Sequence, residues 1–307
     1  MRIVFMGNPE FSLPTLENII KSNFDLVAVV SNPPKPMGRG KKIMSTAVGE
    51  YAKKSKLRLI QPDSLRSKSF HKDLEDLNPD LLVVVAYKIL PDSIIKIPKY
   101  GAINLHASLL PKYRGAGPIQ WALMNGETVT GVTIFKITTT VDTGDILLQK
   151  EYLIDDDDDM LSLGMRLCRG GANLIIKAIA SIKDGESKGK RQNKSLVTSA
   201  PKITKEMTLI DWAWPAKKIH NWVRGLTPYP GMITILNNRK IRIFKTTLIP
   251  GETRSVGEII KADQNQLIIS TGDGLLSLLE IQLEGKKKMF IKDFLNGVTI
   301  TIGSKLG

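Results

Sequence analysis

Residues 81–86, LLVVVA, form an unbroken apolar run of strand length. A strand that is apolar on both faces must be covered on both sides, which is typical of the centre of a parallel sheet. Similar runs occur at residues 2–6 (RIVFM) and 25–31 (DLVAVVS), and stretches of helical periodicity at residues 14–21 and 70–77 alternate with them. The alternation predicts an α/β fold, a Rossmann-like and mostly parallel sheet with helices on both faces. Further strands are expected at residues 57–60, 102–105, 131–138 and 146–154, further helices at residues 46–54, 119–125 and 160–183, and a short helix or turn at residues 94–97.

The ends of these strands are the expected place for chemistry. Ligands of open parallel sheets bind just beyond the carboxyl ends of the strands. In this chain those ends fall at Gly7, at residues 86–91 and at residues 104–106. No GxGxxG motif follows the first strand, where residues 6–9 read MGNP, so dinucleotide binding is not indicated.

The chain changes character near residue 190. Residues 190–208 are polar and charged and are expected to link two domains. After a helix at residues 211–226, short apolar runs separated by turn residues predict a smaller C-terminal β-barrel that is OB-like, of the oligonucleotide-binding type. The expected organisation is therefore a catalytic domain at residues 1–189, the linker, and a barrel domain at residues 209–307. Barrel strands are expected at residues 232–236, 240–245, 257–262, 266–271, 274–284 and 298–303.

Positive charge is concentrated in the last third of the chain. The net charge is +14, and residues 190–307 contain 19 Lys/Arg against 9 Asp/Glu, which is +10 of the total. A basic segment of this size indicates a polyanionic partner, with phosphate backbones the leading candidate. A basic protein without such a partner explains the charge equally well, so charge alone leaves both open.

Cysteine usage and hydropathy indicate the compartment. Cys168 is the one cysteine, which excludes an intrachain disulfide framework, and its apolar-periodic surroundings predict a plain core residue. The longest apolar run, residues 81–87, is far shorter than the roughly 20 residues of a membrane-spanning helix. A strand begins at Arg2 with no leader ahead of it. We therefore expect a cytoplasmic protein without membrane association, and a monomer.

The acidic run Asp155–Asp159 precedes the long helix expected at residues 160–183. We expect a solvated loop whose negative charge favours the helix N-terminus. Five consecutive carboxylates lack the spacing and the turn glycine of a calcium loop, so a metal site is the weaker interpretation.

Three histidines are candidates for acid–base chemistry. His71 lies in the charged stretch HKDLED and is expected at the surface, and His220, in KKIHNW, fits a solvated or RNA-facing position. Only His106 follows a predicted buried strand, and it precedes a loop with glycine and proline, in the sequence NLHASLLPKYRGAGPIQ at residues 104–120. A lone histidine at such a place is more often structural than catalytic, so its neighbours decide the interpretation.

Two neighbours favour a catalytic role for His106. Asn104 lies two residues earlier in extended chain, so both side chains share a face and together can donate hydrogen bonds to one developing oxyanion. Asp142 lies in the turn TTTVDTGDI at residues 138–146, and a carboxylate there could hold His106 protonated or fix its tautomer. Asp142 and Asp145 are also explained as plain turn residues.

Five strings together resemble the folate-dependent formyltransferases: MGNPEF (6–11), VVVAYKILP (83–91), NLHASLLPKYRGAGPIQ (104–120), GVTIFKI (131–137) and DTGDIL (142–147). The resemblance implies an enzyme that transfers a formyl group, with 10-formyltetrahydrofolate as co-substrate and no metal. By this resemblance, the three catalytic residues of that family correspond to Asn104, His106 and Asp142. The implied folate-binding residues are Ser108, Leu109, Leu110 and Pro111, with Ala86, Tyr87 and Leu90 at the pterin pocket.

Within that family, the resemblance runs nearly end to end with members whose acceptor is the amino group of initiator methionyl-tRNA. Residues 32–44, NPPKPMGRGKKIM, are similar to the loop with which those enzymes hold the tRNA acceptor end. The implied tRNA-binding residues are Arg39, Lys41 and Lys42, although a solvated basic loop is the alternative. Residues 286–297, KKKMFIKDFLNG, are similar to their C-terminal domain, which implies that the barrel domain binds tRNA.

Other functions use parts of the same pattern. A sister enzyme would use the trio on a purine-precursor nucleotide or an amino sugar, and neither requires the basic C-terminal third. A non-catalytic RNA-binding relic predicts a broken trio, whereas all three residues are present. Hydrolysis of the formyl carrier is a further alternative.

Two residues depart from the family pattern: Asn8 replaces Thr, and Lys88 replaces Gly. Both leave the trio untouched, and Lys88 is expected to affect folate affinity.

Overall fold

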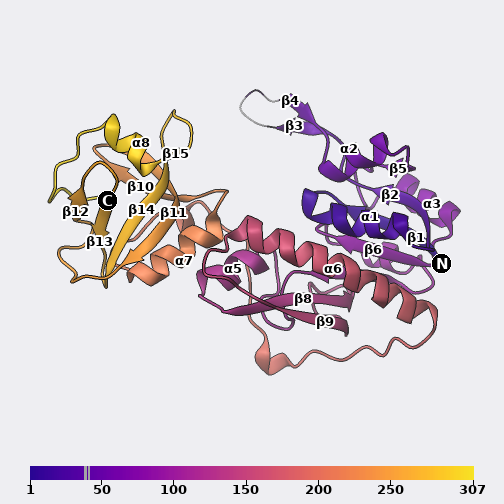
Figure 1. The fold of residues 1–307 in the computed structure, drawn as a ribbon. Coiled ribbons are helices and arrows are strands. Elements are labelled where there is room, and N and C mark those ends of the chain that lie inside the picture. Colours follow the sequence, from indigo (N-terminus) through magenta and orange to yellow (C-terminus); the bar gives the residue numbers. More distant parts are fainter. Residues whose placement is uncertain (38–39, 41) are drawn as a thin grey trace. The chain divides into compact units, whose positions relative to one another are not determined.

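The apolar run at residues 81–86 forms β6 (Leu81–Val85), the middle strand of a seven-stranded sheet in the computed structural model (Figure 1). The strand order is β5-β2-β1-β6-β7-β8-β9. The five strands from β5 to β7 pair in parallel, and β8 and β9 are antiparallel. The predicted α/β class is therefore confirmed. The other strands are β1 (Arg2–Gly7), β2 (Asp25–Val30), β5 (Leu59–Ile60), β7 (Ala102–His106), β8 (Val129–Lys136) and β9 (Ile146–Leu153).

The structure describes residues 1–37, 40 and 42–307, and the chain divides into two units. Unit 1 consists of Met1–Pro118, Val129–Leu153 and Gly164–Ala200, and it contains the seven-stranded sheet. Unit 2 consists of Ile119–Thr128, Ile154–Leu163 and Pro201–Gly307. The division after Ala200 lies within the stretch expected as a linker, residues 190–208.

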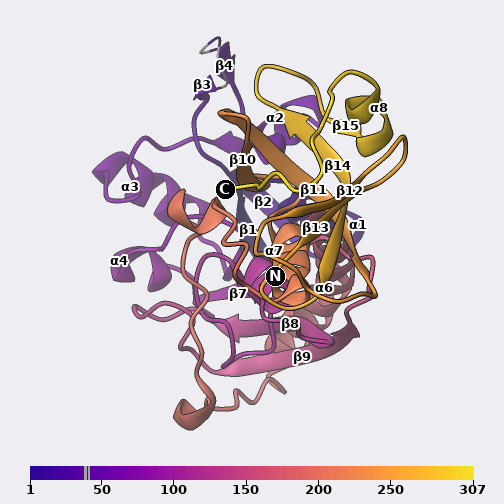
Figure 2. The same ribbon diagram turned by 90° about the vertical axis from the view of Figure 1, so that its left-hand side faces the viewer.

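Helices cover both faces of the sheet of unit 1. Val4 and Met6 of β1 pack in one apolar cluster with Phe70 of α3 and Ile94 of α4. Phe5 points to the opposite face, as alternation along a strand requires, and is also fully buried. Figure 2 shows α3 and α4 on one side of the strands and α1 and α6 on the other. The helices are α1 (Leu13–Lys21), α2 (Ala47–Lys54), α3 (Lys68–Leu77), α4 (Asp92–Ile95) and α6 (Met160–Lys183).

The antiparallel strands of unit 2 form a barrel. They follow the order β10-β11-β14-β13-β12, and β15 pairs with β14. Residues 303–307 join the two outer strands: the Ile259 N–H of β12 donates to the Ser304 carbonyl (2.8 Å), and the Gly307 N–H donates to the Ile235 carbonyl of β10 (3.2 Å). The elements are α5 (Pro118–Met124), α7 (Ala216–Leu226), β10 (Met232–Leu236), β11 (Arg239–Ile249), β12 (Ile259–Ala262), β13 (Leu267–Ser270), β14 (Leu275–Leu283), β15 (Met289–Phe290) and α8 (Ile291–Asn296).

The start predicted for the helix at residues 211–226 was wrong, because α7 begins only at Ala216. Pro215 has an extended backbone (φ −57°, ψ 144°), and the Ala216 N–H donates to the Asp273 carbonyl at 2.8 Å. The preceding residues therefore lie along the barrel instead of continuing the helix. The Trp212 indole N–H donates to the Thr234 hydroxyl at 2.9 Å.

The strand expected at residues 298–303 was also wrong. Residues 291–296 form α8, and the next residues enter a turn in which the Ser304 N–H donates to the Thr301 carbonyl at 3.2 Å. Gly303 has φ +86°, which a strand does not accommodate. A hairpin of β3 (Lys35–Met37) and β4 (Lys42–Met44) was not foreseen.

The acidic run Asp155–Asp159 is more structured than the solvated loop that we expected. The Asp159 carboxylate accepts hydrogen bonds from the Leu161 and Ser162 N–H groups (both 2.9 Å), as an N-cap of α6 does. Asp158 is buried, and its carboxylate accepts from the Ser162 hydroxyl at 2.8 Å. The guanidinium of Arg224 on α7 donates to the Asp156 carbonyl at 2.6 Å. Part of the run is therefore packed into unit 2.

Among the residues that the structure describes, no helix is both long and apolar enough to span a membrane.

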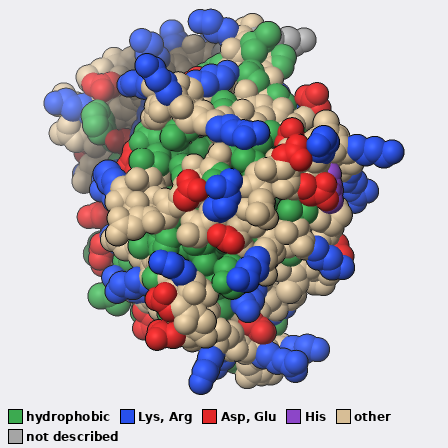
Figure 3. All heavy atoms as spheres, turned by 90° about the vertical axis from the view of Figure 1, so that its right-hand side faces the viewer, with side chains coloured by type: hydrophobic (Ala, Val, Ile, Leu, Met, Phe, Trp, Pro, Cys, Tyr) green, Lys and Arg blue, Asp and Glu red, His purple; other side chains and the backbone are tan. Residues whose placement is uncertain are grey.

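In Figure 3, Lys and Arg side chains lie scattered among Asp and Glu over the face shown, without gathering into one patch.

His220 gives unit 2 a pH dependence that can be measured. Its Nδ1 lies 2.9 Å from the Thr246 hydroxyl. Burial lowers the pKa of His220 below its usual 6.5, the charge of Arg224 lowers it further, and Asp156 and Asp157 partly oppose this. The unfolded chain therefore binds a proton at a higher pH than the folded chain, so stability is lost as pH falls below about 6.5.

We expect the free energy of unfolding of unit 2 to decrease between about pH 7.5 and about pH 5.5, and His220→Gln to reduce this decrease. Tryptophan fluorescence during urea unfolding measures this selectively, because all four tryptophans, Trp121, Trp212, Trp214 and Trp222, belong to unit 2. His71→Gln in unit 1 is the matched control and should leave the pH dependence unchanged. A His220→Gln profile identical to that of the wild type would contradict the prediction.

Candidate active site

His106 is the last residue of β7 and lies in the interior of unit 1. Its Nε2 is 2.8 Å from the Tyr113 carbonyl oxygen, and its Nδ1 is 3.7 Å from Oδ2 of Asp142. The two side chains are only 6% and 11% exposed. The predicted pairing of His106 with Asp142 is therefore present in the fold, although the two residues are far apart in sequence.

The contact with Tyr113 fixes the tautomer of the ring. A carbonyl oxygen only accepts hydrogen bonds, so Nε2 must carry a proton. Nδ1 then faces the Asp142 carboxylate at 3.7 Å, beyond the usual hydrogen-bond length of about 2.7–3.2 Å. The separation leaves this nitrogen available for a third atom that enters the site.

The turn that carries Asp142 is held in place from several sides. Asp142 has φ +54°, a left-handed conformation that Asp tolerates better than most residues. Its Oδ2 accepts a hydrogen bond from the Gly115 N–H at 2.8 Å. Gly144 is required two residues later, because a Cβ there would lie 1.7 Å from the Lys136 carbonyl oxygen.

Asn104 lies on the same face of β7 as His106, two residues earlier. Its backbone pairs with Val84 of β6 and with Phe135 of β8, so a sheet bonded on both sides fixes its position. The side chain is partly buried on this face. An amide in that position can donate a hydrogen bond to a ligand that lies beside the ring of His106.

The loop Ser108–Pro111 is held by β8 and β9. The Thr133 hydroxyl donates to the Ser108 carbonyl (2.6 Å), and the Gln149 amide donates to the Leu110 carbonyl (2.9 Å). Ser108 and Leu110 are buried, while Leu109 and Pro111 are partly exposed. The side chains of Ser108 and Leu110 thus serve the loop itself, and the backbone and the two partly exposed residues remain for contacts with a ligand.

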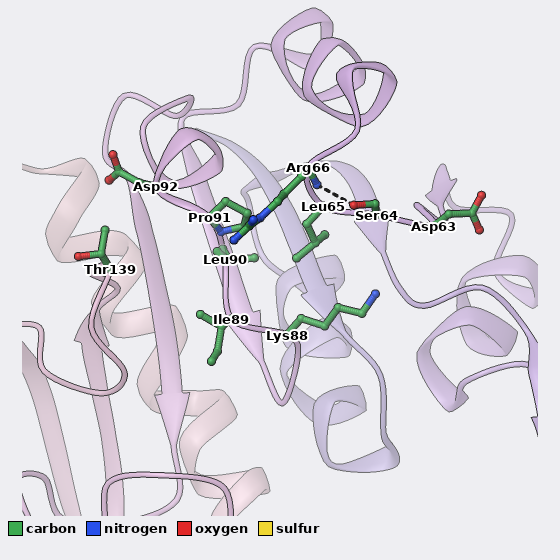
Figure 4. A pocket seen from close by; sticks show the side chains of 10 residues that line it. All are labelled: Asp63, Ser64, Leu65, Arg66, Lys88, Ile89, Leu90, Pro91, Asp92 and Thr139. Carbon is green, nitrogen blue, oxygen red and sulfur yellow. Dashed lines mark hydrogen bonds between the residues drawn. The ribbon is translucent and has the colours of Figure 1, made fainter.

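An open pocket of about 640 Å³ lies beyond the end of β6 (Figure 4). Two segments supply cations to its wall, Arg66 from the stretch before α3 and Lys88 from the loop after β6. Of the predicted folate-binding residues, Leu90 lines this pocket, and Thr139 joins it from the connection that also carries Asp142. The other lining residues are Asp63, Ser64, Leu65, Ile89, Pro91 and Asp92.

Tyr87 and Ala86 directly precede the lining residues of this pocket. Burial raises the pKa of Tyr87 to about 12, so its hydroxyl remains protonated at neutral pH. That hydroxyl is buried and has no hydrogen-bond partner among the residues described. Ala86 is exposed and has φ +48°. A buried donor beside a pocket is a group that a ligand can satisfy.

Of the residues predicted to bind tRNA, Lys42 belongs to the β3–β4 hairpin. Lys42 begins β4 and is exposed. Arg39 and Lys41 lie outside the described residues. Ile43, next to Lys42, is 73% exposed, which is unusual for isoleucine and gives the hairpin an apolar as well as a basic surface.

The other titratable groups singled out in the sequence lie elsewhere. His71 pairs with Glu75 on the surface of α3 (3.4 Å), and His220 belongs to unit 2. Cys168 is buried, and burial raises the pKa of its thiol, as expected of a core cysteine. Within the described part of the chain, no three His, Cys, Asp or Glu side chains form a group that could hold a metal ion.

Several residues that build the site were not predicted from the sequence. The wall at Asp63–Arg66 falls in a stretch without a recognisable motif. Gln192 and Thr198 fall in the expected linker, yet Gln192 donates to the Asp142 carbonyl (2.9 Å), and the Thr198 hydroxyl accepts from the Tyr113 N–H (2.8 Å). No signal in a polar segment distinguishes such residues from solvated ones.

The fold and the site together define an α/β enzyme with a buried histidine at the carboxyl end of a sheet strand and a carboxylate facing it, joined to a β-barrel unit. Residues 1–179 match the family described as "Formyl transferase", and residues 202–299 match "Formyl transferase, C-terminal domain". The chain belongs to the formyl transferase family, as the sequence resemblance predicted.

Relatives match the whole chain. It is 46% identical over 302 residues to a methionyl-tRNA formyltransferase of Thermodesulfovibrio yellowstonii, covering 98% of this chain and 97% of the relative. It is 42% identical over 309 residues to a methionyl-tRNA formyltransferase of Caldanaerobacter subterraneus subsp. tengcongensis, covering 100% of both.

A solved structure shares the fold. HypX from Aquifex aeolicus, in complex with tetrahydrofolic acid, matches with a TM-score of 0.67 and 18% identity, over 96% of this chain. The chain spans about half of that structure, 47% of its length.

The turn at Asp142 can be tested for its tolerance of a side chain. Gly144→Ala places a Cβ against the Lys136 carbonyl, so the turn must move, and we expect a loss of about 1–3 kcal/mol in the free energy of unfolding. Urea unfolding followed by far-UV circular dichroism measures this. Gly40→Ala, which meets no atom within 4 Å, is the control. Equal stabilities of the two variants would show that the turn is not packed as described.

Proposed function

We propose that the protein transfers the formyl group of 10-formyltetrahydrofolate to the amino group of initiator methionyl-tRNA. The product is N-formylmethionyl-tRNA, the aminoacyl-tRNA with which translation begins. The observation that carries the proposal is the buried His106–Asp142 pair at the end of the strand whose same face carries Asn104. It occurs in a chain that is 42–46% identical, over nearly its full length, to relatives named methionyl-tRNA formyltransferase.

In this reaction the amine attacks the formyl carbon, and the carbonyl electrons move onto the formyl oxygen. The bond from that carbon to the folate nitrogen then breaks, and a proton passes from the attacking amine to the leaving nitrogen. Asn104 donates its amide N–H to the oxyanion, and protonated His106 donates from Nδ1, since Nε2 is already bonded to Tyr113.

Asp142 has two functions in this proposal. Its charge, 3.7 Å from Nδ1, stabilises the protonated ring, and its carboxylate assists the proton transfer between the two nitrogens. The Gly115 N–H that bonds to Oδ2 keeps the carboxylate oriented when the acceptor enters. Asn104 and His106 supply the electrophilic assistance, so the proposed step involves no metal.

The pocket at the end of β6 is the proposed place for the folate. Its apolar residues Leu65, Leu90 and Pro91 suit a flat ring, and the free Tyr87 hydroxyl lies next to the same loop. Arg66 and Lys88 supply positive charge for the carboxylates of the glutamate tail. We therefore expect Lys88, which departs from the family pattern, to raise the affinity for the folate through its positive charge. The folate complex of HypX supports this assignment at the level of fold.

The tRNA is the proposed partner of the basic hairpin and of unit 2. Residues 190–307 contain 19 Lys/Arg against 9 Asp/Glu, which suits a phosphate backbone. Lys42 and the exposed Ile43 give the hairpin a charge for phosphates and an apolar side chain for a base. We propose a cytoplasmic protein, in keeping with its single free cysteine, and a monomer.

The first test is a transfer assay with 10-formyltetrahydrofolate and charged initiator tRNA, beside uncharged tRNA and free methionine. Formylated methionyl-tRNA formed only from the charged tRNA is the expected result. Folate turnover without it would move the acceptor to a sugar or nucleotide amine, or to water, and no turnover at all would leave an RNA-binding protein.

The amide of Asn104 is expected to contribute chiefly to the transition state. Asn104→Ala should fold and lose about a hundredfold or more in kcat, because one oxyanion donor is removed. Asn104→Asp, which keeps the shape but replaces the donor by an acceptor, should lose at least as much. Stopped-flow or steady-state formylation assays measure both, with thermal unfolding as the control for folding. Turnover near that of the wild type in either variant would remove Asn104 from the mechanism.

Arg39, although outside the described residues, is expected to contribute to tRNA use. Arg39→Ala should lower kcat/KM for methionyl-tRNA by about tenfold or more and leave the KM for the folate unchanged, because only a contact with the acceptor is lost. The loss should shrink as salt is raised, since salt weakens phosphate contacts. Lys21→Ala, which removes the same charge from α1, is the control. An equal loss for both substrates would indicate a folding defect.

A further inference from the structure

The segment Lys190–Ala200 lies against the two loops that hold His106, although it was expected to be only a linker. At its start, Lys190 is held to Ile146 by a pair of backbone hydrogen bonds (both 2.8 Å). It leaves along Arg114, whose N–H donates to the Thr198 carbonyl (2.9 Å) and whose carbonyl accepts from the Ala200 N–H (2.7 Å). The segment is thus fixed at both ends to the walls of the candidate site.

Gln192 makes the central contacts of this segment. Its amide nitrogen donates to the carbonyl oxygens of Asp142 (2.9 Å) and Gly144 (2.8 Å), on both sides of the turn. Its amide oxygen accepts from Nε (3.1 Å) and Nη2 (2.6 Å) of Arg114. The side-chain amide of Gln192 therefore donates two hydrogen bonds and accepts two, and the residue is partly buried.

These contacts reach both nitrogens of His106. On the Nδ1 side, Gln192 holds the backbone of Asp142, whose carboxylate faces the ring. On the Nε2 side, the Tyr113 carbonyl accepts from the ring, and the Tyr113 N–H donates to the Thr198 hydroxyl at 2.8 Å. Both partners of the imidazole are thus set by residues of one short segment.

We infer that Gln192 is a positioning residue that sets the distance and orientation of Asp142 relative to His106. Its two donors keep the turn at Asp142 in the left-handed conformation that aims the carboxylate at the ring. Arg114, by binding the amide oxygen, fixes which end of the amide points to the turn. This inference deepens the proposed formyl transfer and rests on it for the effect on activity, but the geometry of His106 can be measured without any substrate.

Two substitutions separate the parts of the contact. Gln192→Met keeps the length of the side chain and removes donors and acceptor together. Gln192→Glu keeps the acceptor for Arg114 and replaces the donors by an oxygen that repels the Asp142 and Gly144 carbonyls. Asn193→Asp is the matched control, because it makes the same amide-to-carboxylate change one residue away and keeps the oxygen that accepts from Ser195.

The first readout is the tautomer and orientation of His106, observed by ¹⁵N NMR of the imidazole nitrogens in the whole protein. The chain has only three histidines, and the spectrum of His106→Asn identifies the signal of His106. In the wild type we expect the signal of an Nε2-protonated ring. In Gln192→Met and Gln192→Glu we expect its nitrogen shifts to change, while Asn193→Asp leaves them as in the wild type.

The second readout is the kinetics of formylation. A displaced catalytic group lowers kcat by on the order of ten- to a hundredfold, while substrate binding is little affected. We expect this of both Gln192 variants, with KM for folate and for methionyl-tRNA within about twofold of the wild type. Recovery of kcat in Gln192→Glu would show that the Arg114 contact, and not the two donors, matters, and would overturn the inference.

Unchanged His106 signals together with unchanged kcat in Gln192→Met would also overturn it. Altered His106 signals without any formyl transfer by the wild type would uphold the positioning and refute the proposed function. A variant that fails to fold is recognised by thermal unfolding, and Gln192→Asn then serves as the substitute, because it keeps an amide but is one methylene shorter and cannot reach the same carbonyls. It should alter the Nδ1 signal of His106, and an unaltered signal would count against the inference.

Discussion

The Asp142 carboxylate, held 3.7 Å from the His106 ring in the interior of unit 1, is the constraint on which the rest of the site depends. A buried charge is tolerated only where fixed donors and charges replace the water it has lost. Here one backbone N–H, that of Gly115, donates to the carboxylate, and the Tyr113 carbonyl holds the far nitrogen of the ring. Both groups belong to the loop after β7, so the loop and the pair stabilise each other.

The parallel sheet explains why these groups meet. Because β1, β6 and β7 run in the same direction, their carboxyl ends lie at one edge, with Gly7 opposite Val85 and Val84 opposite Asn104. The loop after β6 lines the pocket, and the residues at the end of β7 provide the amide and the imidazole. The long connection between the antiparallel strands β8 and β9 carries Asp142, and it brings Oδ2 of that residue to 3.7 Å from Nδ1 of His106.

The sequence predicted the structure correctly where a local pattern allows only one structure. The LLVVVA run predicted a central strand, and the spacing of Asn104 and His106 in an extended segment predicted a shared face. Asp142 was a candidate partner of His106 from its place in a turn, and only the family resemblance favoured it over the plain turn interpretation that it shares with Asp145. Gln192 and Thr198 could not be found from the sequence, because their contacts depend on where the polar segment lies in the fold. The start of α7 and the absent strand at residues 298–303 were missed because tertiary hydrogen bonds override local apolar patterns.

The support of the site by residues 190–200 has a physical rationale. A turn with a left-handed residue and a buried carboxylate is costly, and leaving the Asp142 and Gly144 carbonyls without donors would add about 1–3 kcal/mol for each buried group. One glutamine amide satisfies both carbonyls, and its oxygen is satisfied in turn by Arg114. A side chain with fewer donors could not bind both carbonyls. A lysine would bring a positive charge beside His106 and would offer no acceptor to Arg114. The same segment continues at Pro201 into unit 2. Residues 190–200 therefore have two roles: they lead to the unit proposed to bind tRNA, and they orient the proposed catalytic pair. The active geometry of unit 1 thus requires a segment that follows all the strands of its sheet in the sequence.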